Sequence, residues 1–238
     1  MMGDVDAARP EPPAGRPLGR RAFLGLVGLG LSSLVWGEPL VRLLDRAGGA
    51  LPDSLSAVIP SPAGGWRIYA VNPPFPTFDP ATWRLRIDGL VREPVELTAA
   101  ELRGLPRADQ VSDFHCVTGW SVYDVRWGGV RFDTLLEAAG GVRPGARAID
   151  VVSAEEPYVD TLTLEQLRVP DAMLAYDMDG APLTREHGAP VRVVMPRMYG
   201  YKGVKWVARL HVTDRVEPGY WEQRGYDVDA WVGRSNGF

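Results

Sequence analysis

Two short runs of the chain carry residue types that can do chemistry. The first run, Asp113–Trp120, has the sequence DFHCVTGW and holds the only cysteine among the 238 residues. The second run, Tyr199–Trp206, has the sequence YGYKGVKW and holds both lysines of a chain that otherwise uses arginine. A thiolate is a soft metal ligand or a nucleophile, and a lysine ammonium is a compact cation that suits an anionic ligand. The two runs are therefore candidate halves of one ligand-binding site.

Three roles are open for Cys116. A lone cysteine is most often a small buried hydrophobic residue. The irregular stretch around it, with His115 before it and Gly119 and Trp120 after it, favours a soft metal ligand or a nucleophile instead. A nucleophile would need His187 or His115 as its base. A single cysteine excludes an internal disulfide, a CxxC zinc site and a CxxCH haem attachment.

The composition is that of an ordinary globular chain. The mass is 26.1 kDa, and 45% of the residues are hydrophobic and 24% charged. These values suit one domain with its own core, together with a targeting tail. The formal charge of −4 and the pI near 5.5 exclude the basic footprint of a nucleic-acid-binding protein. We therefore expect no nucleic-acid partner.

The hydrophobic pattern predicts an α+β fold with more strand than helix. Thr98 and Glu101 form a capping box for one short helix, and Asp133 is expected to cap a second helix that runs to Gly140. A hairpin turn is expected at 177–180. Apolar runs predict strands at 83–88, 122–127, 130–132, 148–153, 159–162, 173–176, 191–195 and 205–212.

The N-terminal residues predict export. Arg20 and Arg21 precede the apolar run 22–36, and this arrangement resembles a twin-arginine export signal. The run is shorter than the roughly 20 apolar residues that a membrane span needs, so a cleaved signal and an uncleaved N-terminal anchor both remain open. We expect a periplasmic or other extracytoplasmic location, reached through the twin-arginine machinery. The expected segments are a signal or anchor at 1–50, a linker at 51–65, the folded domain at 66–216 and an aromatic tail at 217–238.

Four motifs occur in the order found in one enzyme family. They are 114–121 with 127–130, then 176–183, 186–192 and 199–206. Over about residues 66–225 the chain resembles the sulfite-oxidase-type molybdopterin-dependent oxidoreductases. Within them it is most similar to the periplasmic methionine-sulfoxide reductase catalytic subunit and its bacterial relatives. The resemblance implies mixed strands and short helices around a deep pocket for the molybdenum–molybdopterin cofactor.

The resemblance also implies roles for the residues that match the family motifs. Cys116 matches the cysteine that binds molybdenum, so it is expected to be both metal ligand and catalytic residue. The residue types suit a cofactor with a phosphate and a pterin, because Arg192 offers a planar fork, Lys205 a compact charge and Gly203 close access to backbone N–H groups. The implied cofactor-binding residues are Asn72, Phe75, Cys116, Ser153, His187, Arg192, Gly203, Val204 and Lys205.

Three tryptophans and the aromatic C-terminal run are expected to have structural roles. Trp120, Trp127 and Trp206 are expected in the core and outside the site. The run 219–226 is expected to be a packed tail, with capping of the pocket or docking of a partner as alternatives.

The implied chemistry moves an oxygen atom to or from a small-molecule substrate. Gly119-Trp120-Ser121 stands where sulfite oxidases have an Asn-Arg-Arg run, and the C-terminal dimerisation domain of those enzymes is not found after about Val216. Arg126 and Arg197 are the loose candidates for the cations that a sulfite dianion needs. A sulfoxide-type reductase is therefore favoured. Sulfite oxidation, a non-catalytic binding module of the same fold and a thiol hydrolase are the alternatives.

No haem or iron–sulfur motif accompanies these residues. Electrons must then come from or go to another protein, so a membrane haem protein or a cytochrome is expected as electron partner.

Overall fold

The structure is a computed structural model of the chain and describes residues 65–234. The expected export signal at 1–50 and the linker up to residue 64 lie outside the described residues, so they stay predictions. Within the described part, no helix is both long enough and apolar enough to cross a membrane.

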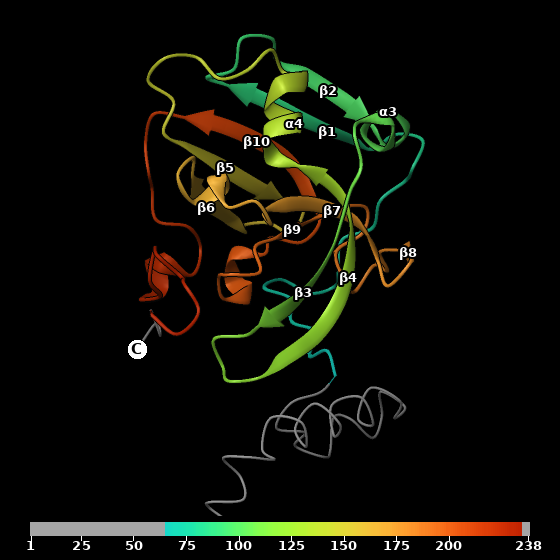
Figure 1. Cartoon of the computed structure of the whole chain (residues 1–238), viewed down its shortest axis with the longest axis vertical. Coiled ribbons are helices and arrows are strands. Elements are labelled where there is room, and N and C mark those ends of the chain that lie inside the picture. Colours follow the sequence, from blue (N-terminus) through green and yellow to red (C-terminus); the bar gives the residue numbers. More distant parts are fainter. Residues whose placement is uncertain (1–64, 235–238) are drawn as a thin grey trace, which may run out of the picture. The chain divides into compact units, whose positions relative to one another are not determined.

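The first of two five-stranded sheets has the order β2-β1-β10-β5-β6 (Figure 1). Its strands are β1 (Arg84–Gly89), β2 (Val95–Thr98), β5 (Ala148–Ser153), β6 (Val159–Thr163) and β10 (Val207–Thr213). The central pair β1 and β10 is parallel, and the other pairs are antiparallel. Because β1 and β10 come from opposite ends of the domain, their pairing ties its beginning to its end.

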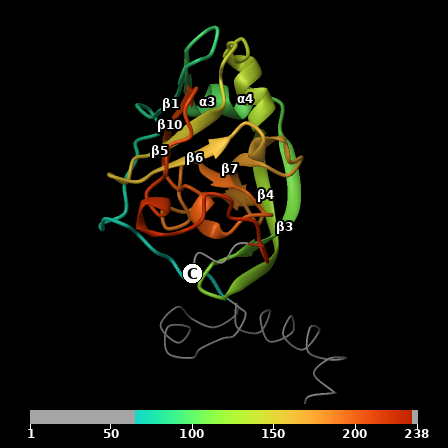
Figure 2. The ribbon, with the colours of Figure 1, turned by 90° about the vertical axis from the view of Figure 1, so that its left-hand side faces the viewer.

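The second sheet is antiparallel and has the order β3-β4-β7-β8, with β9 also paired to β7. Its strands are β3 (Ala108–His115), β4 (Ser121–Arg131), β7 (Met173–Met178), β8 (Ala181–Pro182) and β9 (Arg192–Val194). In Figure 2 the first described residues (cyan) begin beside the tip of the β3–β4 hairpin (green). The loop at this tip contains Cys116.

The helices of the described part are short. They are α3 (Ala99–Gly104) and α4 (Phe132–Ala138), with 3₁₀ turns η1 (Gln166–Arg168), η2 (Gly200–Lys202) and η3 (Glu222–Arg224). The capping box of α3 is confirmed, since the Thr98 and Glu101 side chains each bond to the other residue's backbone N–H. The prediction that Asp133 caps α4 is wrong. The helix begins one residue earlier, after Arg131 with no side-chain cap, and Asp133 lies in its first turn.

The strand predictions differ in how well they hold. The predicted strands that match β1, β5, β6, β7, β9 and β10 are confirmed to within two residues at each end. The segments 122–127 and 130–132 belong to one continuous strand, β4, which passes straight into α4. This strand needs Gly129, because a Cβ there would lie 2.1 Å from the carbonyl oxygen of Leu174 on β7.

Three strands, β2, β3 and the two-residue β8, are absent from the sequence-based expectations. Strand β3 has polar residues on both faces, and its pairing with β4 shifts register between Ser112 and Phe114. Such a strand lacks a clear period of two and forms because β4 supplies its hydrogen bonds. The segment before Cys116 is therefore regular up to His115, not irregular as the sequence suggests.

The main core lies between the first sheet and the elements that cover it. Alternate residues of β1 and β10, such as Leu85, Ile87 and Leu210, are fully buried and pack with Phe132 and Leu135 of α4. A smaller cluster, centred on Val125 and Trp127 of β4, packs under the second sheet. These two cores fix the hairpin tip and the loops around it, which form the site.

Candidate active site

Cys116 lies in the tight loop between β3 and β4. Its N–H donates to the carbonyl oxygen of Trp120 (2.8 Å), and the Gly119 N–H donates to the Cys116 carbonyl oxygen (3.0 Å). Gly119 has φ of +88°, which glycine adopts without strain. The Cys116 Sγ is 3.2 Å from the Thr118 Oγ1, and the residue is half-buried. The loop therefore holds the thiol at a fixed place while leaving it accessible.

A cavity of about 330 Å³ opens beside this thiol. Its wall is mostly aromatic and aliphatic and comes from segments far apart in the sequence. They are Trp66–Val71, the hairpin tip with Cys116 and Trp120, Glu155 with Tyr158, Glu186, Arg192, the residues Gly200, Tyr201, Gly203 and Lys205, and Trp221 with Tyr226. A cavity of this size and lining suits a small molecule or a cofactor.

Arg192, the first residue of β9, is a buried cation with poor partners. Its guanidinium donates to the carbonyl oxygens of His187 (3.3 Å) and Gly203 (3.4 Å), and the rings of Trp66, Phe114 and Trp127 lie 5.4–5.9 Å away. No carboxylate lies within ion-pair distance of it in the described part of the chain. Burial lowers its pKa to about 10. A buried cation without a counter-ion is costly, so an anionic ligand would stabilise it.

Lys205 is a second cation in this wall, half-buried and also without an ion pair. Its Nζ donates to the carbonyl oxygens of Tyr69 (2.7 Å) and Glu186 (3.3 Å) and lies 4.1 Å from the centre of the Trp206 ring. Burial, together with repulsion from Arg192, lowers the pKa of Lys205 to about 7. The ammonium therefore also gains from a nearby anion.

Three buried nitrogen atoms near these cations have no hydrogen-bond partner among the described residues. They are His187 Nδ1, Trp120 Nε1 and Trp127 Nε1. All three rings pack around Trp66, at 5.0–6.4 Å between ring centres. Burial, then repulsion from Arg192 and Lys205, lowers the pKa of His187 to about 4, so its ring is neutral at pH 7. Unsatisfied buried donors of this kind call for a polar ligand.

Four of the sequence-predicted site residues line the cavity: Cys116, Arg192, Gly203 and Lys205. Gly203 is held close, because a Cβ there would lie 3.1 Å from the Arg192 Nη2.

The other predicted site residues do not line the cavity. The Ser153 Oγ donates to the Lys205 carbonyl oxygen (2.8 Å), and Phe75 stacks on Trp206 with 5.4 Å between ring centres. Val204 is fully buried, and its carbonyl oxygen accepts from the Val193 N–H.

The exposed Asn72 is fixed through its backbone. Its N–H donates to the Glu155 Oε1 (2.9 Å), and its side chain donates to the Glu156 carbonyl oxygen (3.1 Å). The buried Glu155 thereby holds the end of the first described segment at the cavity. No sequence motif points to Glu155, because its partners are more than eighty residues away in the chain.

The tail and one tryptophan have a larger role than the sequence predicts. Trp120 and Trp206 are buried, as expected, but Trp120 also lines the cavity. The C-terminal segment is packed, and it also contributes Trp221 and Tyr226 to the cavity wall. Lys202, by contrast, does not line the cavity; it is buried against two carboxylates.

A match to a protein-family model identifies the family of this chain. The family model described as "Oxidoreductase molybdopterin binding domain" matches residues 72–221. The chain belongs to this family. It is a molybdopterin-dependent oxidoreductase that uses the molybdenum cofactor, and the predicted family, enzyme class and cofactor are confirmed.

Relatives of this molybdopterin oxidoreductase differ in what they are named for. The uncharacterised oxidoreductase YuiH of Bacillus subtilis is 39% identical, over 64% of this chain and 77% of the relative. The putative protein-methionine-sulfoxide reductase subunit YedZ1 of Azospira oryzae is 35% identical, over 66% of this chain and 58% of the relative. The chain therefore spans little more than half the length of that reductase subunit.

A solved structure confirms the α+β fold. The sulfane dehydrogenase SoxCD from Paracoccus pantotrophus superposes with a TM-score of 0.57 at 26% identity, over 65% of this chain and 43% of that chain. The molybdopterin oxidoreductase thus shares its fold with a sulfane dehydrogenase.

The donor set around the cavity fits the family's cofactor. A pterin presents hydrogen-bonding edges and a phosphate carries negative charge. Among the described residues, the wall offers two cations without counter-ions and the unpaired Trp120 Nε1, and the unpaired His187 Nδ1 and Trp127 Nε1 belong to rings that pack against Trp66 of this wall. The thiol of Cys116 faces the same cavity. The unpaired cations and ring nitrogens are energetically costly in the chain alone. A bound cofactor would supply the negative charge and the hydrogen-bond partners that they lack.

The geometry does not support a thiol hydrolase. Such an enzyme needs a histidine within hydrogen-bond reach of the nucleophile. The Cys116 Sγ instead bonds to the Thr118 Oγ1, and His115 Nδ1 bonds to the Ser121 Oγ at 2.9 Å. His187 Nδ1 has no partner within the described residues.

Proposed function

We propose that this molybdopterin oxidoreductase is an exported enzyme that reduces a neutral sulfoxide to a thioether. One observation carries the proposal. The thiol of Cys116 shares a cavity with Arg192 and Lys205, and neither cation has a carboxylate partner in the described structure. This combination suits a cofactor that brings both a metal for the sulfur and negative charge for the cations.

In this proposal Cys116 is the molybdenum ligand, and its Sγ lies 3.2 Å from the Thr118 Oγ1. Arg192 and Lys205 hold the anionic part of the cofactor, and Gly203 and Val204 allow backbone groups to approach it. The remaining residues proposed to contribute to cofactor binding are Asn72, Phe75, Ser153 and His187.

The neutral His187 ring supports the proposal in a further way. Its Nδ1 is buried and unpaired within the described structure, and its pKa near 4 keeps it uncharged at pH 7. A neutral imidazole can donate through one nitrogen and accept through the other. It can therefore bond to a pterin edge without adding a third positive charge.

When bound, the molybdenum cofactor supplies the oxygen-atom transfer. The overall change is R₂SO + 2 e⁻ + 2 H⁺ → R₂S + H₂O, so two electrons and two protons must be delivered for each substrate. The chain's own groups bind and orient the reactants, and the mostly aromatic and aliphatic lining of the cavity excludes water from them.

The charges around the cavity support a neutral substrate. Its described cations are Arg67, Arg192 and Lys205, and the proposal uses two of them for the cofactor. The loose candidates for a sulfite dianion lie elsewhere: Arg197 pairs with Asp171 at 3.0 Å, and Arg126 is not part of the wall. A dianion would therefore find little positive charge left for it.

Export and an electron partner belong to the same proposal. The paired arginines at Arg20 and Arg21 before an apolar run support the twin-arginine route and a periplasmic location. A membrane haem protein or a cytochrome would supply the electrons, and the relative named as a reductase subunit supports such a division of labour.

The test uses full-length protein from a molybdenum-replete host. We expect about one molybdenum and one pterin per chain, and reduction of dimethyl sulfoxide with reduced methyl viologen as the electron donor. Cys116→Ser should abolish turnover, because a hydroxyl is a harder and less acidic ligand than a thiol. Val111→Ala, at an exposed position of the same hairpin, should leave turnover unchanged.

Other results would overturn the proposal. Oxidation of sulfite with ferricyanide, without any reduction of sulfoxides, would establish the sulfite-oxidising alternative. Folded protein that binds metal and pterin and turns over neither compound would establish a non-catalytic binding module.

A further inference from the structure

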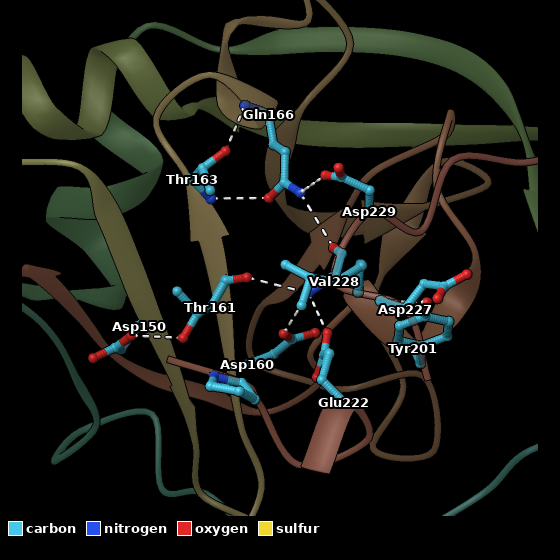
Figure 3. A network of polar contacts seen from close by, with 12 residues as sticks. Asp150, Asp160, Thr161, Thr163, Gln166, Tyr201, Glu222, Asp227, Val228 and Asp229 are labelled. Atoms are coloured by element: carbon cyan, nitrogen blue, oxygen red, sulfur yellow. Dashed lines mark hydrogen bonds and ion pairs between the residues drawn. The ribbon is translucent and has the colours of Figure 1, made fainter. Parts of the chain in front are cut away.

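Lys202 is the centre of a buried ion cluster beside the cavity. Its side chain is 1% exposed, and its Nζ donates to the Asp160 Oδ1 (2.8 Å), to the Thr161 carbonyl oxygen (3.2 Å) and to the Glu222 Oε1. Figure 3 shows the Asp160 and Glu222 side chains approaching the same point, from β6 and η3. An ammonium has three hydrogens, so all of its donors are used.

The cluster joins three segments that also build the cavity wall. Each ion follows, by one or two residues, an aromatic residue that lines the cavity. The pairs are Tyr158 with Asp160, Tyr201 with Lys202 and Trp221 with Glu222. We call these three rings the aromatic wall. Each ion therefore shares a short stretch of backbone with one of these rings.

The segments approach too closely for this cluster to be a loose surface contact. A Cβ on Gly219 would lie 2.7 Å from both the Asp160 Oδ1 and the Glu222 Oε2. The Tyr158 hydroxyl donates to the Tyr201 carbonyl oxygen, and the Tyr201 hydroxyl donates to the Asp227 carbonyl oxygen at 2.7 Å. These bonds join Tyr158 to Tyr201, and Tyr201 to the C-terminal segment that also carries Trp221 and Glu222.

The C-terminal segment has a second anchor farther along. The Gln166 amide donates to the Val228 carbonyl oxygen (3.3 Å) and to the Asp229 carboxylate (3.0 Å), as Figure 3 also shows. Loss of the Glu222 bond alone would therefore free the stretch around Trp221 without detaching the whole segment.

We propose that Lys202, Asp160 and Glu222 are positioning residues that hold the aromatic wall in place, and that the wall binds the apolar substituent of the sulfur substrate. The second half of this inference rests on the proposed function. Fully buried ion clusters seldom add stability over hydrophobic packing of the same volume, and they can instead fix a unique arrangement. Three segments meeting at one ammonium is such an arrangement.

Two substitutions of Glu222 distinguish the effect of its hydrogen bond to Lys202 from the effect of its negative charge. Glu222→Gln keeps an oxygen that accepts from Lys202, whereas Glu222→Ala removes it. In the cofactor-loaded enzyme, Glu222→Ala should raise the KM for methyl phenyl sulfoxide about tenfold, since a displaced wall misplaces the substrate. We expect kcat to stay within about twofold, and the KM for the smaller dimethyl sulfoxide within about threefold, because these depend less on the wall. Glu222→Gln should resemble the wild type.

A matched control removes an ion cluster away from the cavity. Asp88 is buried and binds Arg209 at 3.0 Å on the first sheet, so Asp88→Asn costs stability without touching the aromatic wall. This variant should leave the ratio of the two KM values unchanged. An equal rise in that ratio in Asp88→Asn would overturn the inference, because general destabilisation would then explain the effect.

A readout without turnover keeps this inference separate from the proposed function. Hydrogen exchange of the backbone amides at 219–226 should speed up in Glu222→Ala and not in Glu222→Gln. Binding of methyl phenyl sulfone, which carries the same ring, should weaken in the same variant by calorimetry. If the wild type reduces no sulfoxide, the proposed function fails. Hydrogen exchange and sulfone binding would still test whether the ion cluster holds the aromatic wall in place. Unchanged exchange and unchanged sulfone binding in Glu222→Ala would overturn the inference.

Discussion

Lys202 and Lys205 are three residues apart in one motif, and their surroundings are opposite. Lys202 is fully buried and binds two carboxylates, whereas Lys205 is half-buried and binds only backbone carbonyl oxygens. The two carboxylates raise the pKa of Lys202 despite its burial. Burial and a neighbouring arginine lower the pKa of Lys205 to about 7. Identical side chains thus serve the fold in one case and remain available to a ligand in the other.

The same contrast divides the larger regions around the two lysines. Around Lys202 every ammonium hydrogen has an acceptor, and the bonds link β6, η2 and η3. Around Lys205 lie Arg192 without a counter-ion and His187 with an unpaired nitrogen, within the described residues. Among the described residues, one oxygen of each carboxylate in the Lys202 cluster also lacks a partner, but its lysine is paired. Since an uncompensated buried cation is costly, the region around Lys205 is the one that would gain from an anionic ligand.

The largest expected effect comes from removing the paired lysine. Lys202→Met would leave Asp160 and Glu222 facing each other without a cation, and breaking such a buried cluster costs about 3–5 kcal/mol. Urea unfolding of the cofactor-free protein at pH 7.5 measures this loss. A loss below about 1 kcal/mol would contradict the account, because that is the size of an ordinary surface substitution.

The matched substitution at the other lysine should behave differently. Lys205→Met should change the free energy of unfolding of the cofactor-free protein by no more than about 1 kcal/mol, because it removes a desolvated cation as well as its two hydrogen bonds to backbone carbonyl oxygens. It should instead reduce retention of the pterin about tenfold or more, since a charge-assisted bond to an anion is lost. Extraction and fluorescence of the oxidised pterin measure retention. Normal retention in Lys205→Met would break the comparison.

A smaller effect should appear in the pH dependence of stability. Burial, with repulsion from Glu222, raises the pKa of Asp160 to about 7 from its ordinary 3.8. The folded state therefore binds a proton that the unfolded state releases, so this contribution to stability is complete below about pH 4 and is lost as the pH rises to about 7. The Asp160→Asn variant has no such proton to lose. The Tm of this variant minus the Tm of the wild type should therefore rise by about 5 °C between about pH 4 and pH 7. A constant difference in Tm would count against the shared cluster.

The smallest effect gives a baseline far from both lysines. Thr98→Ala removes the capping box of α3 and should cost about 1 kcal/mol. It should leave both cofactor retention and the KM ratio unchanged. If it altered either one, effects at Lys202 and Lys205 could not be attributed to their own regions.

Local features of the fold follow from the sequence. The capping box at Thr98 and the strand at 148–153 agree with the structure because each depends on residues next to one another. Strand β3 does not, because its partner strand and not its own pattern makes it regular. The start of α4 also differs, since Phe132 is drawn into the core and begins the helix ahead of Asp133.

Only some of the residues of the candidate site can be predicted from the sequence. Cys116, Arg192, Gly203 and Lys205 belong to motifs and do face one cavity. The motif cannot distinguish Lys202 from Lys205, because the carboxylates that pair with Lys202 lie 42 and 20 residues away in the chain. Glu155 is hidden for the same reason.

One measurement tests the contrast directly, because the chain has only these two lysines. Lysine labelled with ¹³C at Cε gives two NMR signals, which Lys202→Met and Lys205→Met assign. In the cofactor-free protein, the Lys205 signal should titrate near pH 7 and the Lys202 signal should not titrate below its ordinary pKa of 10.5. Loading the cofactor should move the Lys205 titration upward, because an anion stabilises the charged form. Two signals that both titrate near the ordinary value, or a Lys205 signal that ignores the cofactor, would contradict the account.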